Sequence, residues 1–218
     1  MVSIAYKMIT ANRKESKIEM KKVVIFGAAG HTGKYITEKM KSEKDIELSV
    51  FVRNPAKFGD MDITGVNVIQ GDALKAEDVV KAMEGQEIML CSLEGDVLTM
   101  AKNIVSALEK TSVKRIIWIT GMGIHHEIKG IRGMMLNRYA KQRPEYIEAA
   151  DTIAASPAVT TLLRCPGIKN GDNTKYFLTK EGDQPAHKDI ERAGIAQCMY
   201  DLIEDASLGV NESLGITN

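Results

Sequence analysis

A glycine-rich turn between an apolar strand and a helix is the feature that most limits how this chain can fold. The turn reads Gly27-Ala-Ala-Gly30-His-Thr-Gly33, after the apolar run 23–26 and before the helix-forming run 34–41. Its glycines allow, in order, a sharp turn, close approach of the backbone to a ligand, and close helix–strand packing. The helix N-terminus then presents free N–H groups and a positive dipole end to an anion. The pattern predicts a dinucleotide pyrophosphate site, with an ordinary glycine-rich loop as the alternative.

The backbone of this turn supplies the first candidate cofactor contacts. His31 is included because its N–H group points toward phosphate whatever its ring does. The candidates in this stretch are Gly27, Ala29, Gly30, His31, Thr32 and Gly33.

Short apolar runs alternate with helix-period segments from residue 21 onward. Such alternation implies right-handed crossovers and a parallel sheet with helices on both faces. We therefore predict the α/β class, as a single doubly wound Rossmann domain with strand order 3-2-1-4-5-6. The expected strands are 22–26, 47–52, 66–69, 88–92, 115–120 and 160–164, and the expected helices lie near 32–43, 75–84, 97–110, 144–155 and 189–204.

The 218 residues suffice for one ordinary domain with a full core. We assign residues 21–218 to the NAD(P)-binding domain and expect residues 1–20 to be a loosely attached extension. An extra helix docked on the sheet is the alternative, and Met20 is an alternative start. Two long polar segments, 121–143 and 167–188, are expected to be loops on the substrate side, because long loops at the carboxyl edge of such sheets are commonly functional.

Composition excludes several classes of function. Lys and Arg (29) balance Asp and Glu (29), so nucleic acid is not an expected partner. The three cysteines lie far apart without metal-ligand spacing, so we expect neither a metal site nor a disulfide framework, and a reducing cytoplasm fits best. Every apolar run is shorter than the ~18 residues of a membrane span, so no membrane partner is expected.

The residues after the second expected strand favour NADP(H) over NAD(H). An NAD site places a carboxylate ~20 residues past the glycines to bind the ribose hydroxyl. This chain has Arg53 there, with Lys57 one helical turn on. A guanidinium binds a 2′-phosphate through paired N–H donors, whereas a carboxylate would repel it. A solvated surface arginine is the alternative.

Further candidate contacts follow the next strands of the sheet. Asp72 and Ala73 follow the third, where the carboxylate can accept a hydrogen bond from adenine and can also cap the next helix. Cys91 and Ser92 end the fourth strand, with Cys91 expected to be a packed thiol, not a nucleophile. Thr120 ends the fifth strand, near the expected nicotinamide.

Several motifs together resemble those of one superfamily. They are the turn 27–33, Val52-Arg-Asn-Pro55, Gly71-Asp72, the strand 113–120, and the late blocks 150–156 and 161–166. The chain from about residue 21 to the C-terminus resembles the atypical short-chain dehydrogenases/reductases, in particular NmrA-like, biliverdin reductase B-like and NAD(P)H-flavin reductase-like proteins. This resemblance implies a Rossmann fold and NADP(H), and is less specific for a substrate.

The chain departs from that superfamily at the catalytic pair. Carbonyl-reducing members use Tyr-x-x-x-Lys, in which Lys lowers the Tyr pKa for proton exchange. In the expected region Tyr139 is followed by Arg143 and Tyr146 by Ala150. Two literal matches elsewhere, 35/39 and 176/180, are rejected as coincidental. His125 and His126 offer an alternative proton donor, although a solvated loop is the simpler interpretation.

The missing pair suits hydride transfer to an acceptor whose own ring stabilises charge. We therefore predict an NADPH-dependent oxidoreductase acting on a small molecule, a flavin, quinone or similar conjugated acceptor, and name no catalytic residue. The alternative is an NADP(H)-sensing regulator without catalysis, which would act through a protein partner. A nucleotide-sugar epimerase relative is a third hypothesis, opposed by the absent Tyr-Lys pair.

Overall fold

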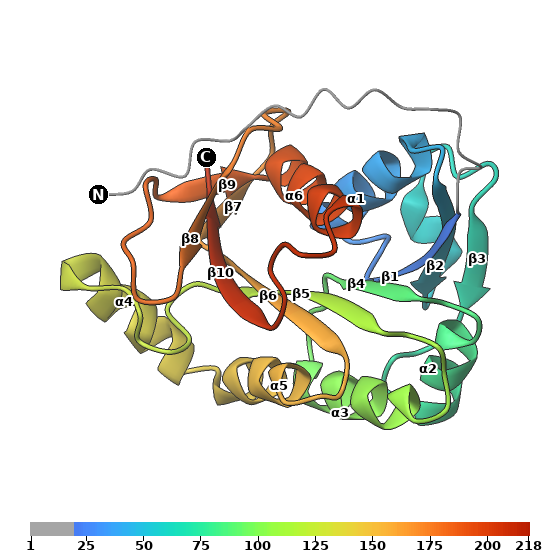
Figure 1. Ribbon diagram of the computed structural model, residues 1–218, viewed down its shortest axis with the longest axis horizontal. Coiled ribbons are helices and arrows are strands. Elements are labelled where there is room, and N and C mark those ends of the chain that lie inside the picture. The colour runs from blue at the N-terminus through green and yellow to red at the C-terminus, as the bar shows by residue number, and fades with distance from the viewer. Residues whose placement is uncertain (1–19) are drawn as a thin grey trace.

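The predicted alternation of strands and helices builds one central sheet with helices on both faces (Figure 1). The computed structural model describes residues 20–218, so the predicted extension 1–20 lies outside the described residues apart from Met20. In chain order the sheet strands are β1 Lys21–Phe26, β2 Ile46–Val52, β3 Asn67–Gln70, β4 Ile88–Cys91, β5 Arg115–Gly121, β6 Val159–Cys165, β8 Phe177–Lys180 and β10 Glu212–Thr217.

The strand order is β3-β2-β1-β4-β5-β6-β10-β8. Its first six strands pair in parallel, which confirms the predicted order 3-2-1-4-5-6 and the doubly wound α/β class. Two strands extend the predicted sheet. β10 pairs in parallel with β6, and β8 runs antiparallel to β10 at the edge.

Alternating side chains divide the core between the two faces of the sheet. On β1, Val24 and Phe26 pack toward α2 Ala76–Met83, α3 Val97–Leu108 and α5 Pro144–Ala154. Val23 and Ile25 pack on the other face, toward α1 His31–Ser42 and α6 Arg192–Glu204. A strand that is buried on both faces is apolar throughout, which is why these runs were recognisable in the sequence.

The segment 121–143 is not the loop that we expected, since most of it forms helix α4, Gly130–Lys141. Two of its glycines occupy positions where a side chain would not fit the backbone or its surroundings, and they do not interrupt the helix. Gly130 has a φ of +74°, which favours glycine. Gly133 lies on the buried side, where a Cβ would be 1.7 Å from the carbonyl oxygen of Ile128. The run 134–141 that follows is rich in good helix formers.

The segment 167–188 also contains more regular structure than expected. β7 Gly167–Lys169 pairs in parallel with β9 Asp189–Glu191 as a small second sheet. β8 lies between them in the sequence. A 3₁₀ turn, η1 Pro55–Phe58, follows β2.

Candidate functional site

The glycine turn leaves β1 with the geometry that its sequence predicted. Gly27 has a φ of +83°, and a Cβ there would lie 2.0 Å from the carbonyl oxygen of Ser92. The N–H group of Gly30 donates to the carbonyl oxygen of Gly27 at 3.0 Å, which closes the turn. α1 then begins at His31, and Gly30 has no side chain with which to cap it. The N–H groups of the first helical turn thus remain available to an anion.

Gly33 serves the packing of the turn. It is buried in α1, and a Cβ there would lie 2.0 Å from the carbonyl oxygen of Gly27 and 2.8 Å from that of Ala28. No side chain can occupy that space without displacing the backbone of the turn. Gly33 therefore allows α1 to start close against the end of β1.

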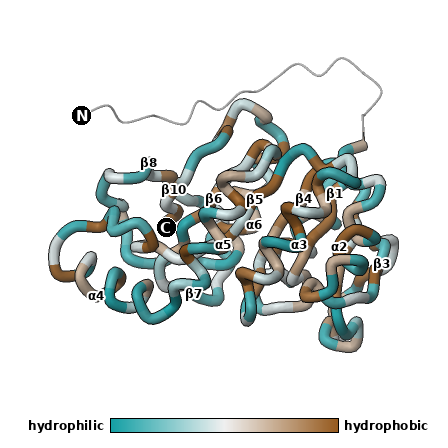
Figure 2. Tube along the Cα trace, turned by 90° about the horizontal axis from the view of Figure 1, so that it is seen from below, coloured by the Kyte–Doolittle hydropathy of each residue, from teal (hydrophilic) through white to brown (hydrophobic). Residues whose placement is uncertain are grey.

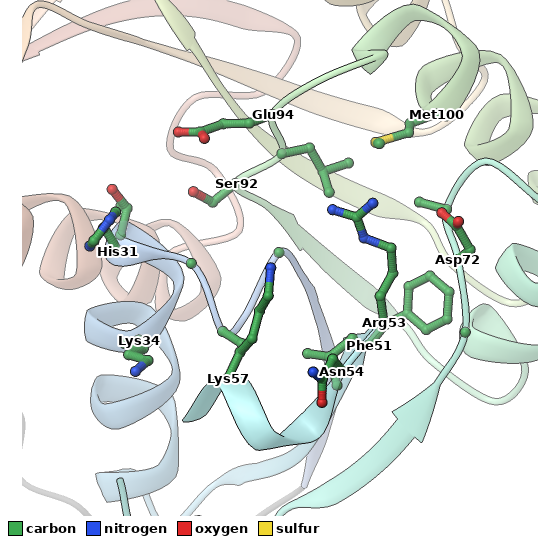
Figure 3. Close-up of a pocket in the computed structure, with 18 residues that line it drawn as sticks. His31, Lys34, Phe51, Arg53, Asn54, Lys57, Asp72, Ser92, Glu94 and Met100 are labelled. Atoms are coloured by element: carbon green, nitrogen blue, oxygen red, sulfur yellow. The ribbon is translucent and has the colours of Figure 1, made fainter. Parts of the chain in front are cut away.

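A cavity of about 480 Å³ opens beside this turn, at the carboxyl ends of β1 to β4 (Figure 3). Nine of the residues predicted for the cofactor line it: Gly27, Ala29, Gly30, His31, Thr32, Arg53, Asp72, Ala73 and Ser92. The lining also includes Lys34, Phe51, Val52, Asn54, Lys57, Gly71, Leu93, Glu94 and Met100.

Arg53 and Lys57 make the β2 side of the cavity positive. In Figure 3 the guanidinium of Arg53 points into the cavity, between Lys57 and Asp72. Neither cation forms an ion pair within residues 20–218. Two charges without carboxylate partners beside a glycine turn can both contact a bound phosphate.

Local hydrogen bonds hold the segment that carries these cations. Asn54 caps η1, because its Oδ1 accepts a hydrogen bond from the N–H group of Ala56 at 3.0 Å. Lys34 of α1 donates from Nζ to the carbonyl oxygen of Phe58 at 3.0 Å. Lys34 thereby ties η1 to the helix whose N-terminus faces the cavity.

Asp72 lines the opposite side of the cavity, but it does not cap the following helix as expected. Its Oδ1 accepts a hydrogen bond from the N–H group of Leu74 at 3.1 Å, and its own N–H group donates to Asp78 at 2.9 Å. α2 begins later, at Ala76, with Lys75 as its N-cap. The sequence Asp72-Ala-Leu-Lys75 forms a turn first, so the carboxylate caps that turn.

Gly33, Cys91 and Thr120, also predicted for the cofactor, lie outside the cavity lining. Cys91 is 1% exposed, and burial raises the pKa of its thiol, so it is a packed thiol and not a nucleophile. Thr120 is buried at the end of β5, and its hydroxyl has no hydrogen-bond partner among the described residues. That hydroxyl is a polar group that a ligand could satisfy.

Sequence reasoning missed several residues of the lining. Leu93 and Glu94 directly follow Ser92, so extending the candidate stretch past β4 would have found them. Met100 lies on α3 and Phe51 lies inside β2, and no sequence motif marks either residue as a cofactor contact. Their apolar side chains give the cavity a wall suited to a flat ring.

The rejected Tyr-x-x-x-Lys matches have other roles in the structure. Lys39 lies 4.3 Å from the ring centroid of Tyr200. Tyr176 donates from its hydroxyl to Asp201 at 2.6 Å, and Lys180 forms an ion pair with Glu212 at 3.2 Å.

Arg143 lies close to the rings of two tyrosines, Tyr139 of α4 and Tyr146 of α5. The guanidinium of Arg143 lies 5.0 Å from the ring centroid of Tyr139 and 5.6 Å from that of Tyr146. The hydroxyl of Tyr146 accepts a hydrogen bond from the N–H group of Gly95 at 3.3 Å. These contacts place a cation near both rings, but not the lysine of a proton-exchanging pair.

His125 joins three segments. Its Nε2 lies 2.9 Å from Asp151 of α5, and its Nδ1 lies 2.9 Å from Glu181, which follows β8. Burial opposes the charged ring, but the hydrogen bonds and charges of Asp151 and Glu181 outweigh it and raise the pKa of His125. Because both ring nitrogens are engaged, this geometry gives no support to His125 as a proton donor for a substrate.

Two other kinds of site are absent from residues 20–218. No three or more His, Cys, Asp or Glu side chains gather there as metal ligands would. In that same part of the chain, every helix is too short or too polar to cross a bilayer.

The sequence of this chain is similar to those of known nucleotide-binding proteins and oxidoreductases. The family model of NAD(P)H-binding proteins matches residues 27–206. Quinone oxidoreductase 2 of Escherichia coli strain K12 is 28% identical over 146 residues, which are 65% of this chain and 47% of that protein. The chain thus spans about half the length of that relative.

Solved structures share the fold. A Rossmann-fold NAD(P)-binding family protein from Shigella flexneri is 27% identical, with a TM-score of 0.75 over 92% of this chain and 94% of the other. A short-chain dehydrogenase/reductase from Veillonella parvula, in complex with NADP, is 22% identical, with a TM-score of 0.76 over 91% and 94%. These matches confirm the Rossmann fold, and the family match confirms a nicotinamide nucleotide as the cofactor.

Proposed function

The chain belongs to the family of NAD(P)H-binding proteins, and from this premise we propose that it is an NADPH-dependent oxidoreductase. The acceptor in this proposal is a flavin, a quinone or a similar conjugated ring. The similarity to a quinone oxidoreductase supports this class of reaction.

The observation that carries the proposal is Arg53 in the cavity beside the glycine turn. The site fits NADP(H) in three respects. A side chain at Gly27 would occupy the space inside the turn, and the start of α1 offers free N–H groups. Within residues 20–218, Arg53 and Lys57 form no ion pair with a carboxylate. In this arrangement the turn holds the pyrophosphate, Arg53 with Lys57 holds the 2′-phosphate, and Asp72 accepts a hydrogen bond from adenine.

When bound, NADPH would supply a hydride, which carries two electrons to the acceptor ring, and a proton from solvent would neutralise the heteroatom of that ring. The chain contributes binding and orientation, and a conjugated ring delocalises the charge that a Tyr-Lys pair would otherwise stabilise. Thr120, next to the last residue of β5, has a buried hydroxyl without a hydrogen-bond partner among residues 20–218, and this hydroxyl could hydrogen bond to the carboxamide of the nicotinamide or to the acceptor.

An NADP(H)-sensing regulator is the second candidate function. It is favoured by the residues that follow the two tyrosines near α5, because Arg143 and Ala150 stand where the lysine of a proton-exchanging pair would be. A regulator would also need an exposed surface for its partner.

Two measurements on the purified protein separate these functions. The first is NADPH oxidation with FMN, riboflavin and a panel of small quinones, and the second is calorimetric titration with NADPH and NADH. Turnover together with tight NADPH binding supports the reductase. Tight binding without turnover for any acceptor favours the regulator, and absence of binding contradicts both.

A further inference from the structure

Helix α4 exposes an apolar face that nothing in the described structure covers. Ile131 is 81% exposed, Met134 71%, Met135 69% and Tyr139 58%. Their spacing of three and four residues places them on one side of the helix. Large side chains this exposed are uncommon on a soluble surface unless something binds them.

The opposite side of α4 fixes the helix to the rest of the protein. Gly133 and Ala140 are its buried residues. Gly133 contacts the backbone of Ile128, and Leu136 lies against Gly123. Arg132 donates to the carbonyl oxygens of His187 and Lys188 at 3.2 and 2.8 Å. The exposed face is therefore held in a fixed direction.

This face lies far from the cofactor cavity. In Figure 1, α4 projects at one end of the molecule, whereas β2 and β3, which border the cavity, lie at the other, and Figure 2 shows α4 and β3 at opposite ends. A ligand in the cavity beside Arg53 does not cover these side chains.

The charged residues of α4 and of the sequence directly beside it are all positive. Between Ile128 and Pro144 the sequence contains five cations and no Asp or Glu. Arg132 is bound to backbone carbonyls, and the others are exposed: Lys129, Arg138, Lys141 and Arg143. Arg138 lies one turn after Met134, so the exposed face carries apolar and cationic side chains together. Such a face suits the interface of an anionic bilayer, because arginine and lysine keep their charge at the level of the phosphates while their stems lie along apolar surface.

We propose that α4 docks the protein peripherally on an anionic phospholipid surface. The apolar side chains would enter the boundary between headgroups and acyl chains, while the cations contact lipid phosphates. This inference revises the expectation that no membrane takes part, and it does not depend on the proposed reaction.

Charge argues against a second copy of the chain as the occupant. A two-fold interface through α4 would place the same patch on both sides, so the four exposed cations would face the same four. Like charges across an interface disfavour association. An anionic surface instead attracts each of the exposed cations.

The experiment measures binding of the full chain to sedimented vesicles. One vesicle contains phosphatidylcholine with phosphatidylglycerol, and the other contains phosphatidylcholine alone. We expect binding to the anionic vesicles only, weakened by added salt, because charge attraction to the surface is screened. Equal binding to both vesicles, or binding to neither, overturns the proposal. Binding to neither is also the result expected if α4 binds an acidic protein and not a lipid surface.

Variants assign any binding to α4. Arg138→Gln with Lys141→Gln removes two cations and is expected to lower vesicle affinity roughly 30-fold, from the typical contribution of a cation near an anionic surface. Ile131→Gln with Met135→Gln tests the apolar face and should also reduce binding. The matched control, Lys81→Gln with Lys110→Gln, removes the same charge from exposed positions on α2 and after α3, and should leave affinity within about threefold. If the control weakens binding as much as the α4 variants do, or if those variants bind normally, the proposal is wrong.

Discussion

Arg164 of β6 and Glu127, in the segment after β5, form an ion pair with both side chains only 2% exposed. The carboxylate of Glu127 also accepts hydrogen bonds from the N–H groups of Gly123 at 2.7 Å and His125 at 3.1 Å. Burial opposes the charge on Glu127, but these hydrogen bonds and Arg164 outweigh it and lower the pKa of Glu127. The pair therefore anchors the segment that leads into α4.

Glu127→Gln should lower the free energy of unfolding by about 3–5 kcal/mol, because it leaves the Arg164 guanidinium buried without a counter-charge. Urea unfolding at neutral pH measures this. The double variant Glu127→Gln with Arg164→Met should recover most of the loss, because it removes the unpaired charge while the amide oxygen of glutamine still accepts from the N–H group of Gly123. A single variant as stable as the wild type would show that the pair does not anchor the segment.

Gly33→Ala should disrupt the turn itself, because the added Cβ would lie 2.0 Å from the carbonyl oxygen of Gly27. We expect a loss of about 1–3 kcal/mol in stability, typical of overpacking, together with weaker NADPH binding. Gly30→Ala is the comparison, because there the Cβ would lie 3.2 Å from the same oxygen. It should affect NADPH affinity more than the melting temperature. If both variants melt like the wild type, the packing role of Gly33 is refuted.

Arg53→Gln should weaken NADPH binding by roughly 10- to 100-fold, the usual contribution of a charged hydrogen-bond donor. NADH, which lacks the 2′-phosphate, should bind within about threefold of its wild-type affinity. Calorimetric titration with both nucleotides checks this, and the NADH titration reports whether the site is intact. Equal loss for both would remove the 2′-phosphate assignment.

Stability should depend on pH through His125. Its pKa in the folded protein is raised above the ordinary value of 6.5 by the groups around it. The contribution is therefore fully present below about pH 6.5 and is lost as pH rises through the folded pKa. It should be about 1 kcal/mol or less, because the site is partly exposed. His125→Gln should flatten the stability profile just above pH 6.5, and an unchanged slope would contradict the bridge to Asp151 and Glu181.

The first part of the fold was predictable because its signals are local. The strand 23–26, the glycines of the turn and the position of Arg53 all lie within a single βαβ unit, where sequence order fixes spatial order. For this reason, the predicted residues that line the cavity all come directly after β1, β2, β3 or β4.

The later elements escaped prediction because their causes are tertiary. Gly130 and Gly133 are typical of a loop, and only the contact of Gly133 with Ile128 explains a glycine inside α4. β10 carries Gly215 within a strand, and it is stabilised by pairing with β6 across many intervening residues. Met100 enters the cavity from α3 through packing alone.

The position of β10 between β6 and β8 has a consequence for biosynthesis. β8 leaves the ribosome before the strand it pairs with, and β6 has an open edge until residues 212–217 follow. At roughly 5–20 residues per second, that edge stays unpaired for seconds in every nascent chain. An unpaired strand edge is a template for association between chains. Truncation before residue 212 should therefore give aggregates in place of a soluble shorter protein.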